Sequence, residues 1–493
     1  MFKLLVLLLS LLVSCSSGTN EFKVGLSQEP NTLDLHNTTS QVSRFIMLEN
    51  VLERIIVIDN NQELHPALIN SWEFSNNNKT LKLNLKDDLY FSNQDKVKPS
   101  DFLFSLNRWI DSSYSARVIC GNNNYFEIEN NSLIINSNQS LVFLPYYMAS
   151  SKQAAVLIQE DTNSLINKPI GTGPYYLDSW TIGSNVVLKK VENYKTRDKE
   201  DILDLNGEKK ALFPSITYSF IPDDFARVAA LEKEEIYFMN DLPFDYLNND
   251  FEKGEVYKDN VTGSFVLLLN KAEGVLQNKT IRQALEIGLD KNRLMMSCYT
   301  PGSYELNLNY MQSTSKDFQV DLEYNQNDKQ TAIKMIKTAK AEGSTIRVLS
   351  SNLSNMDKTA MVLKDELTTL GFNVELVIRD WASYLELRED KSSFDIAITA
   401  LTNDSIPSQK LFFSSNYPGW TEDAKLSTLL EEFNNSESLE AASVKWKEVQ
   451  NYCYDYIPVI VLGHYKTAFL VSQKLKDVIY NNGFYFYSAY LDN

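Results

Sequence analysis

Two glycines between two prolines are the clearest candidates for ligand chemistry in this chain. Gly171 and Gly173 lie in residues 168–175, KPIGTGPY, and a glycine-rich loop can hold a phosphate with its backbone amides. A dinucleotide site needs further glycines opening a helix, a nucleoside triphosphatase loop needs a Gly-Lys-Ser/Thr, and neither follows here. Pro169 and Pro174 instead stiffen the segment. We therefore interpret it as a rigid turn that carries the chain between two domains.

Other residues that could be catalytic do not form a known constellation. The sequence has no GxSxG elbow, no HExxH helix and no SxxK signature with its partner motifs. Paired carboxylates occur at residues 87–88 and 234–235, but adjacent side chains diverge on helices and strands. The three histidines, His36, His65 and His464, include no i,i+4 pair. We expect no enzyme activity, no resident metal and no cofactor.

The N-terminus has the pattern of a secretory signal. Lys3 precedes the apolar residues 4–13, a run too short to span a bilayer. Cys15 follows a small residue, as in the bacterial lipoprotein box, in which the thiol is lipidated and the peptide is cut before it. We expect residues 1–14 to be the signal peptide and residues 15–21 a tether held to the membrane through Cys15. The alternative is a simple signal with an incidental cysteine.

The charge of the chain restricts its partners. The 493 residues carry a formal net charge of −17, which disfavours binding to nucleic acid and to anionic lipid, so membrane attachment requires a discrete anchor. The length predicts about three domains. The remaining cysteines, Cys120, Cys298 and Cys453, are widely spaced without a CxxC pair. We expect buried free thiols, with at most one bridged pair.

Local patterns predict a mixed α/β protein. Strand-like content marks residues 22–26, 81–85, 133–136, 141–144, 214–221 and 261–270. The strands over residues 133–136 and 141–144 are expected to pair with each other. Helices are expected after the capping residues Thr39 or Ser40, Ser100, and Asp223 or Asp224. The first of these helices is expected to carry apolar residues as far as Ile56.

A regular alternation follows in the second half of the chain. It consists of a helix over residues 329–341, a strand over 345–350, a helix over 356–370 and a strand over 373–378. This order predicts βαβ units and a largely parallel sheet. A further helix over residues 280–290 contains Arg282, which we expect to form a structural ion pair rather than to bind an anion.

Several motifs in order resemble one known family. Residues 29–34 (EPNTLD), 65–73 (HPALINSWE), 168–180 (KPIGTGPYYLDSW) and 280–290 (TIRQALEIGLD) are similar to motifs of the bacterial extracytoplasmic solute-binding proteins, family 5. These proteins deliver oligopeptides, dipeptides or nickel to ATP-binding-cassette (ABC) importers. The resemblance covers roughly residues 22–493. It implies an α/β, periplasmic-binding-protein-like fold (type II, cluster C) with two lobes, an extra small domain and a ligand cleft between the lobes.

The resemblance also implies a division of the chain. Lobe I is expected to comprise residues 22–52, 168–262 and 464–493. The extra domain II is expected over residues 53–167, and lobe III over residues 263–463.

A loop of the peptide-binding members provides the first candidate ligand residues. In those members the strand after a Phe-Asp motif leads to a loop whose Asp holds the α-ammonium group of the peptide. The corresponding loop here is residues 400–407, ALTNDSIP, in which Asn403 falls where that Asp is usual and Asp404 follows one residue later. Either Asp404 takes the role, or the affinity for a free amino terminus falls because Asn403 carries no charge.

Three aromatic residues complete the candidate ligand site. Tyr114 aligns with a cleft tyrosine of the oligopeptide-binding members. Trp381 and Trp420 are candidates for the lining of the cleft, and a core or rim position is the alternative for each.

The resemblance implies a lipid-anchored, extracytoplasmic binding protein that captures a peptide, passes it to ABC permease subunits and acts as a monomer in the periplasm or at the cell surface. One alternative is the same fold binding a non-peptide or amine-blocked ligand, such as a glycan, a cell-wall peptide or a metal chelate. The other is a surface adhesin or receptor lipoprotein.

Overall fold

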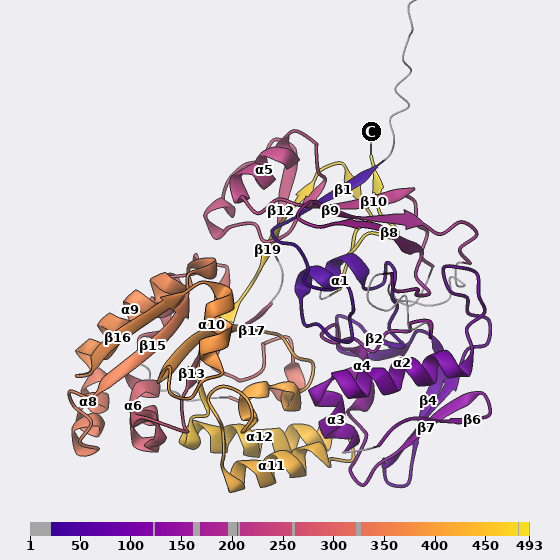
Figure 1. Cartoon of the computed structure of the whole chain (residues 1–493). Coiled ribbons are helices and arrows are strands. Elements are labelled where there is room, and N and C mark those ends of the chain that lie inside the picture. The colour runs from indigo at the N-terminus through magenta and orange to yellow at the C-terminus, as the bar shows by residue number, and fades with distance from the viewer. Residues whose placement is uncertain are drawn as a thin grey trace, which may run out of the picture.

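The computed structural model of this chain consists of three bodies, each built on its own sheet (Figure 1). It describes residues 21–121, 124–160, 168–195, 205, 208–258, 262–321, 327–481 and 483–492, without the side chains of residues 114 and 115. We refer to the bodies as lobe I, domain II and lobe III. None of the helices in these ranges is long and apolar enough to cross a membrane.

Lobe I contains a seven-stranded sheet within the described residues. Its order is β12 (Gly254–Lys258), β19 (Ala468–Ser472), β11 (Phe238–Met239), β1 (Phe22–Leu26), β10 (Ser215–Phe220), β9 (Asn185–Lys190) and β8 (Tyr175–Thr181). β1 lies parallel to β10 and β11 near the middle of the sheet and is largely buried. Helices α1 (Gln41–Met47) and α5 (Asp224–Glu232) belong to this body. The strands expected over residues 22–26 and 214–221 are confirmed.

Lobe III contains a six-stranded sheet within the described residues. Its order is β14 (Tyr304–Glu305), β18 (Val459–Tyr465), β13 (Gly263–Leu269), β17 (Ile396–Thr402), β15 (Thr345–Ser351) and β16 (Asn373–Arg379). Its helices are α6 (Lys279–Gly288), α7 (Lys291–Met296), α8 (Lys329–Thr338), α9 (Met356–Thr369), α10 (Trp381–Arg388), α11 (Ala424–Asn434) and α12 (Leu439–Tyr456). The predicted alternation of helix and strand is confirmed. The expectation of a largely parallel sheet is wrong, because among the described strands of this sheet only β15–β16 and β15–β17 pair in parallel.

The antiparallel pairs of lobe III arise from the strands that connect the lobes. The chain enters lobe III on β13, directly after β12 of lobe I, and returns from β18 to β19 of lobe I. Because one strand enters and the other leaves, β13 and β18 are antiparallel. Thr262 and Thr467 lie side by side between the lobes, one on each connecting segment, with their hydroxyl oxygens 2.8 Å apart. Two connecting segments of this kind form a hinge between lobes I and III.

Domain II packs a four-stranded sheet against helices (Figure 1). The order is β4 (Ile69–Ser75), β5 (Thr80–Leu85), β7 (Ser132–Asn136) and β6 (Glu127–Glu129). The helices are α2 (Pro99–Ser112), α3 (Tyr114–Cys120) and α4 (Leu144–Ala149), and the short strands β2 (Ile56–Ile58) and β3 (Leu64–Pro66) pair beside α4. The expected strand over residues 141–144 is wrong: Leu144 starts α4, with Pro145 in the first turn, where a missing amide donor is tolerated.

Capping explains where other helices begin. Ser40 caps α1 by accepting a hydrogen bond from the amide of Ser43, and Asp223 caps α5, as expected. The cap expected at Ser100 is wrong, because α2 begins at Pro99 and the residue before it, Lys98, is the N-cap. The helix expected to reach Ile56 ends at Met47, where a buried turn with a positive φ at Glu49 interrupts it.

The glycines of residues 168–175 are explained by close packing of two backbones. A β-carbon on Gly171 would lie 2.0 Å from the carbonyl oxygen of Val51, and one on Gly173 would lie 2.3 Å from that of Asn50. The turn therefore docks on the segment after α1, which agrees with a rigid passage between domains rather than a phosphate loop. Trp180, at the end of the same motif, donates its indole N–H to Glu29 at 2.8 Å.

Domain II and lobe III share one hydrophobic core. The cluster contains buried residues of both bodies, and Phe143 of domain II stacks on Phe433 of α11 with ring centroids 5.1 Å apart. The described cysteines are buried free thiols, as expected, and burial raises the pKa of Cys120 to about 12. Arg282 is structural, but its guanidinium donates to backbone carbonyls such as that of Tyr456 rather than to a carboxylate.

Candidate ligand site at the junction of the lobes

The carboxylate of Asp404 lies where lobe III meets domain II. It lies two residues after the end of β17 and is 9% exposed. Its Oδ1 is 2.6 Å from Nζ of Lys152, in the loop after α4, and its Oδ2 is 3.1 Å from Nζ of Lys410. Lys152 also donates to the carbonyl of Thr402 at 2.8 Å. One carboxylate is thus shared by two ammonium groups, one of them from another body.

The charges in this cluster depend on one another. Burial opposes ionisation of Asp404, but attraction to Lys152 and Lys410 outweighs it and lowers the pKa of Asp404. Burial likewise lowers the pKa of Lys152 to about 8, against the attraction of Asp404. The oxygens that would hold a ligand's α-ammonium therefore already face two ammonium groups of the protein.

Asn403 connects this loop to the hinge. Its amide donates to the carbonyl of Thr262 at 2.9 Å, next to the contact between the two connecting segments at Thr262 and Thr467. The side-chain amide of Gln312 donates to the backbone carbonyl of Asp404 at 2.8 Å. The loop therefore has backbone contacts on both sides, and the hinge lies one residue from the carboxylate.

The two tryptophans lie at opposite edges of the lobe III sheet. Trp381 begins α10 after the carboxyl end of β16, the same edge at which Asp404 follows β17, and it is 38% exposed while its ring stacks on Tyr384. Trp420 packs on Phe394, which precedes β17, and so lies towards the other edge. The structure brings Trp381 to the edge that carries Asp404 and does not bring Trp420 there.

Of two other predicted residues, Tyr114 is placed only in part and Cys15 is not placed. Tyr114 begins α3, and its side chain lies outside the described residues. Cys15 lies in residues 1–20, which are also outside them.

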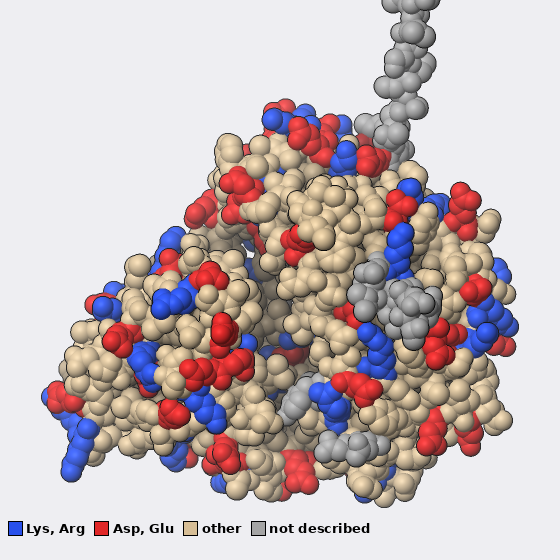
Figure 2. All heavy atoms as spheres, viewed as in Figure 1, with Lys and Arg blue, Asp and Glu red and all other residues tan. Residues whose placement is uncertain are grey.

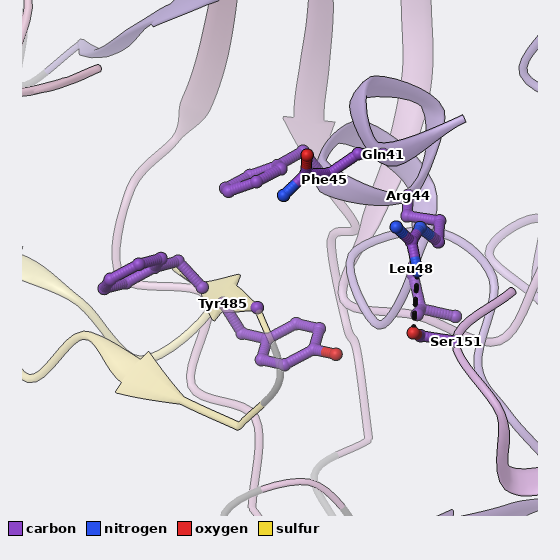
Figure 3. A pocket seen from close by; sticks show the side chains of 8 residues that line it. Gln41, Arg44, Phe45, Leu48, Ser151 and Tyr485 are labelled. Carbon is purple, nitrogen blue, oxygen red and sulfur yellow. Dashed lines mark hydrogen bonds between the residues drawn. The ribbon is translucent and has the colours of Figure 1, made fainter. Parts of the chain in front are cut away.

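A small pocket that sequence reasoning did not find lies beside the cluster of Asp404, Lys152 and Lys410. A cavity of about 30 Å³ is lined by Arg44, Ser151, Tyr485 and the neighbouring residues Gln41, Phe45, Leu48, Gly483 and Phe484. Figure 3 shows Arg44 pointing from α1 towards Ser151, with Tyr485 on the facing segment. Nη1 of Arg44 donates to Oγ of Ser151 at 2.8 Å. The one available sequence signal was a cation among the apolar residues Val42, Phe45 and Ile46 of α1.

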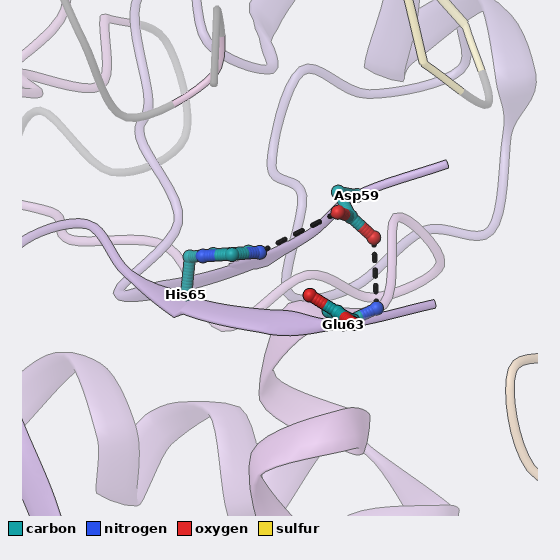
Figure 4. A group of neighbouring side chains, drawn as sticks. All are labelled: Asp59, Glu63 and His65. Carbon is teal, nitrogen blue, oxygen red and sulfur yellow. Dashed lines mark hydrogen bonds and ion pairs between the residues drawn. The ribbon is translucent and has the colours of Figure 1, made fainter. Parts of the chain in front are cut away.

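A second polar cluster lies in domain II. Asp59, Glu63 and His65 place one potential metal ligand each within 4.8 Å of one another (Figure 4). However, Oδ1 of Asp59 accepts the backbone amides of Asn61 and Glu63 at 2.8 Å each, which is the hydrogen bonding of a tight turn. We assign this cluster to the turn between β2 and β3.

The space between the lobes is visible on the surface. Figure 2 shows a furrow between the lobe III body and the body formed by lobe I and domain II, with acidic and basic side chains interspersed on the face shown. The hinge strands connect lobes I and III, so a solute in the furrow would be enclosed by movement about the hinge.

Comparison with known proteins agrees with this geometry. The profile described as "Bacterial extracellular solute-binding proteins, family 5 Middle" matches residues 63–423. A probable peptide ABC transporter periplasmic-binding protein, y4tO, of Sinorhizobium fredii is 21% identical over 471 residues, covering 90% of this chain and 88% of that protein. Two solved structures share the fold and cover 96% of this chain. DppA of Helicobacter pylori in complex with the peptide STSA has a TM-score of 0.80, 17% identity and 98% of its chain covered. NikA of Staphylococcus aureus in complex with Ni(L-His)2 has a TM-score of 0.78, 16% identity and 100% of its chain covered. With a profile match over most of its length and the two-lobed fold in place, this chain belongs to the family 5 bacterial extracellular solute-binding proteins.

Proposed function

We propose that this chain is the substrate-binding component of an ABC importer, capturing a peptide between its lobes and handing it to permease subunits. The observation that carries the proposal is the pair of connections between the lobes, β12–β13 and β18–β19, which meet at Thr262 and Thr467 beside the loop that holds Asn403 and Asp404. Closure about this point would enclose a solute and bring polar groups of both lobes against it. The protein binds and releases its cargo without chemistry.

We also propose a lipid anchor for the protein and a division of its chain into lobe I, domain II and lobe III. Cys15 is the lipid attachment site, residues 1–14 are the signal peptide and residues 15–21 are the tether, so that the binding body works as a monomer outside the cytoplasm. The division is lobe I over residues 22–52, 168–262 and 464–493, domain II over residues 53–167 and lobe III over residues 263–463. The separate sheets support this division.

The ligand residues we propose lie at one edge of lobe III. Asn403 and Trp381 contact the cargo there, and Asp404 acts through the two lysines that it holds. Tyr114 and Trp420 stay predictions from the sequence. Because Asp404 already faces Lys152 and Lys410, a cargo without a free amine is the second candidate for the same fold.

Native mass spectrometry of the mature protein, purified gently and without refolding, tests the proposal. A series of added masses at amino-acid spacings would support a peptide carrier, and a single repeated mass would support one specific small solute. The same protein unfolded, dialysed and refolded is the control, because it loses a bound ligand but keeps covalent modifications. If no small molecule co-purifies and the stripped protein binds nothing from a mixed tripeptide pool, the proposed peptide transport is wrong.

A further inference from the structure

Arg44 is a cation without a carboxylate partner among the described residues. Its described hydrogen bond is the one to Oγ of Ser151, and its buried Nε has no acceptor. A guanidinium keeps its charge at any pH that a protein experiences. Withdrawing part of such a group from water without an anion costs free energy, so a half-buried arginine with no described carboxylate partner, beside a cavity, indicates that a ligand supplies the anion.

The cavity beside Arg44 has room for one functional group. Its volume of about 30 Å³ compares with the 10–15 Å³ needed to hold one water molecule, so it can take a carboxylate but not an amino-acid residue. The aromatic rings of Phe45, Phe484 and Tyr485 form much of its lining. Polar contacts are available from Arg44 and Ser151 (Figure 3). This lining suits the charged end of a larger molecule.

The surrounding charges leave a positive excess. A buried group between lobe I and domain II is neutral, since two carboxylates face two cations: Glu49, Glu53, Arg54 and Lys209. The neighbouring group has one carboxylate and two ammonium groups, Asp404 with Lys152 and Lys410. Arg44 adds a further positive charge beside it. Its hydrogen-bond partner Ser151 precedes Lys152 in the chain, and the charge of Arg44 contributes to lowering the pKa of Lys152.

We propose that this junction binds an anionic oxygen group of the cargo, a carboxylate, through Arg44 with the support of Lys152. The inference rests on the proposed function and deepens it: the cargo is a peptide held by a carboxylate, and its amino terminus is not the anchor. Two features carry the proposal. The expected ammonium site is filled by the protein's own lysines, and the unpaired guanidinium lies beside a cavity of the right size.

End-group chemistry of the ligand gives a direct test. One mixed tripeptide pool is prepared in four versions, with the amino terminus free or acetylated and the carboxyl terminus free or amidated. Binding to the stripped protein is measured by calorimetry. We expect acetylation to change the affinity by less than about threefold and amidation to weaken it by at least about tenfold, the effect of losing a charge-assisted hydrogen bond.

Variants connect the preference to the residue. The ratio of affinities for the free and amidated pools is compared within each protein, so that a general loss of stability cancels. Arg44→Gln is expected to reduce this ratio to near one. Lys189→Gln, which removes a surface cation paired with Asp178, is the matched control and should keep the ratio. Arg44→Lys keeps the charge, should keep part of the ratio, and is the variant to use if Arg44→Gln does not fold.

Each outcome decides between the two proposals. An amidation effect that Arg44→Gln abolishes supports the carboxylate site. Binding that depends on the free amine but not on the free carboxyl, or an amidation effect that survives Arg44→Gln, overturns this inference and leaves peptide transport standing. Binding of none of the four pools counts against peptide transport itself, and this inference falls with it.

Discussion

Replacing Asp404 by Asn tests the charge cluster at the junction of domain II and lobe III. The two side chains are nearly the same size, so the change removes the negative charge with little loss of packing. Lys152 and Lys410 would then face an uncharged amide at the positions where Asp404 oxygens now lie 2.6 and 3.1 Å from their ammonium nitrogens. The expected result is a large loss of stability that depends on pH.

The size of the loss follows from the distances. At an effective dielectric constant of about 20, the Coulomb energies of the two pairs are about 6 and about 5 kcal/mol. Desolvation of the three groups offsets much of this attraction. Removing one partner of a buried pair typically costs about 3–5 kcal/mol, because the remaining charge is left uncompensated. We expect a loss of that size in the free energy of unfolding at pH 6.

The dependence on pH has a definite sign. In the wild type the pKa of Lys152 is about 8, below its ordinary 10.5. Between these two pH values the unfolded chain binds a proton that the folded chain lacks, so the free energy of unfolding rises with pH in this range. Without Asp404 the folded pKa falls further, and the rise begins at a lower pH. The difference in stability between variant and wild type therefore shrinks by up to about 1.4 kcal/mol per pH unit as pH increases towards 8.

Chemical denaturation of the stripped protein at several pH values between 6 and 9 measures both effects. Asp178→Asn is the control, because it breaks a partly exposed pair with Lys189 and should cost no more than about 1 kcal/mol without this pH dependence. A loss below about 1 kcal/mol for Asp404→Asn, or a loss that stays constant between pH 6 and 8, would refute the view that Asp404 compensates two buried ammonium groups.

Three further predictions concern other parts of the fold. Gly171→Ala should destabilise the protein by at least about 3 kcal/mol in denaturant unfolding, because the new methyl group would overlap the carbonyl of Val51; Gly183→Ala, strained but in open space, should cost about 1 kcal/mol, and equal losses would contradict the packing argument. Burial lowers the pKa of His464 to about 4, so the unfolded chain binds a proton at a higher pH than the folded chain does. The free energy of unfolding should therefore fall by about 3 kcal/mol, through this residue alone, as pH drops from 6.5 to 4. Protonation of His464 near pH 6.5 in the folded protein, measured by nuclear magnetic resonance, would contradict the lowered pKa. Cys120, Cys298 and Cys453 should react with a thiol reagent only after unfolding, since they are buried and burial raises their pKa values; rapid modification of the native protein would contradict that placement.

Sequence reasoning was most successful where a feature depends on neighbours in the chain. The N-cap of Ser40 on α1 and the strand β5 depend on local sequence, and both were predicted. It was wrong where local preference and environment disagree. Leu141 was expected in a strand but is buried before α4, because an apolar run of this length fits either environment and Pro145 favours a helix start.

Of the ligand site proposed above, the sequence pointed only to the lobe III half. The resemblance directed attention to Asn403 and Asp404, and the structure places them at the hinge. The resemblance could not identify the basic residues near these two. Lys152 is separated from Asp404 by 252 residues, and Arg44 is an isolated cation on a short helix.

The sequence by itself determined the class of protein, the order of its elements and the loop that carries Asp404, because motifs, caps and periodicity are written along the chain. Only the tertiary structure decided what that carboxylate does. Long-range contacts bring Lys152 and Lys410 to its oxygens and leave Arg44 beside a small cavity with no carboxylate partner in the described part of the chain. Electrostatic energy depends on the distances between charges and on their burial, and neither can be derived from the spacing of residues in the chain.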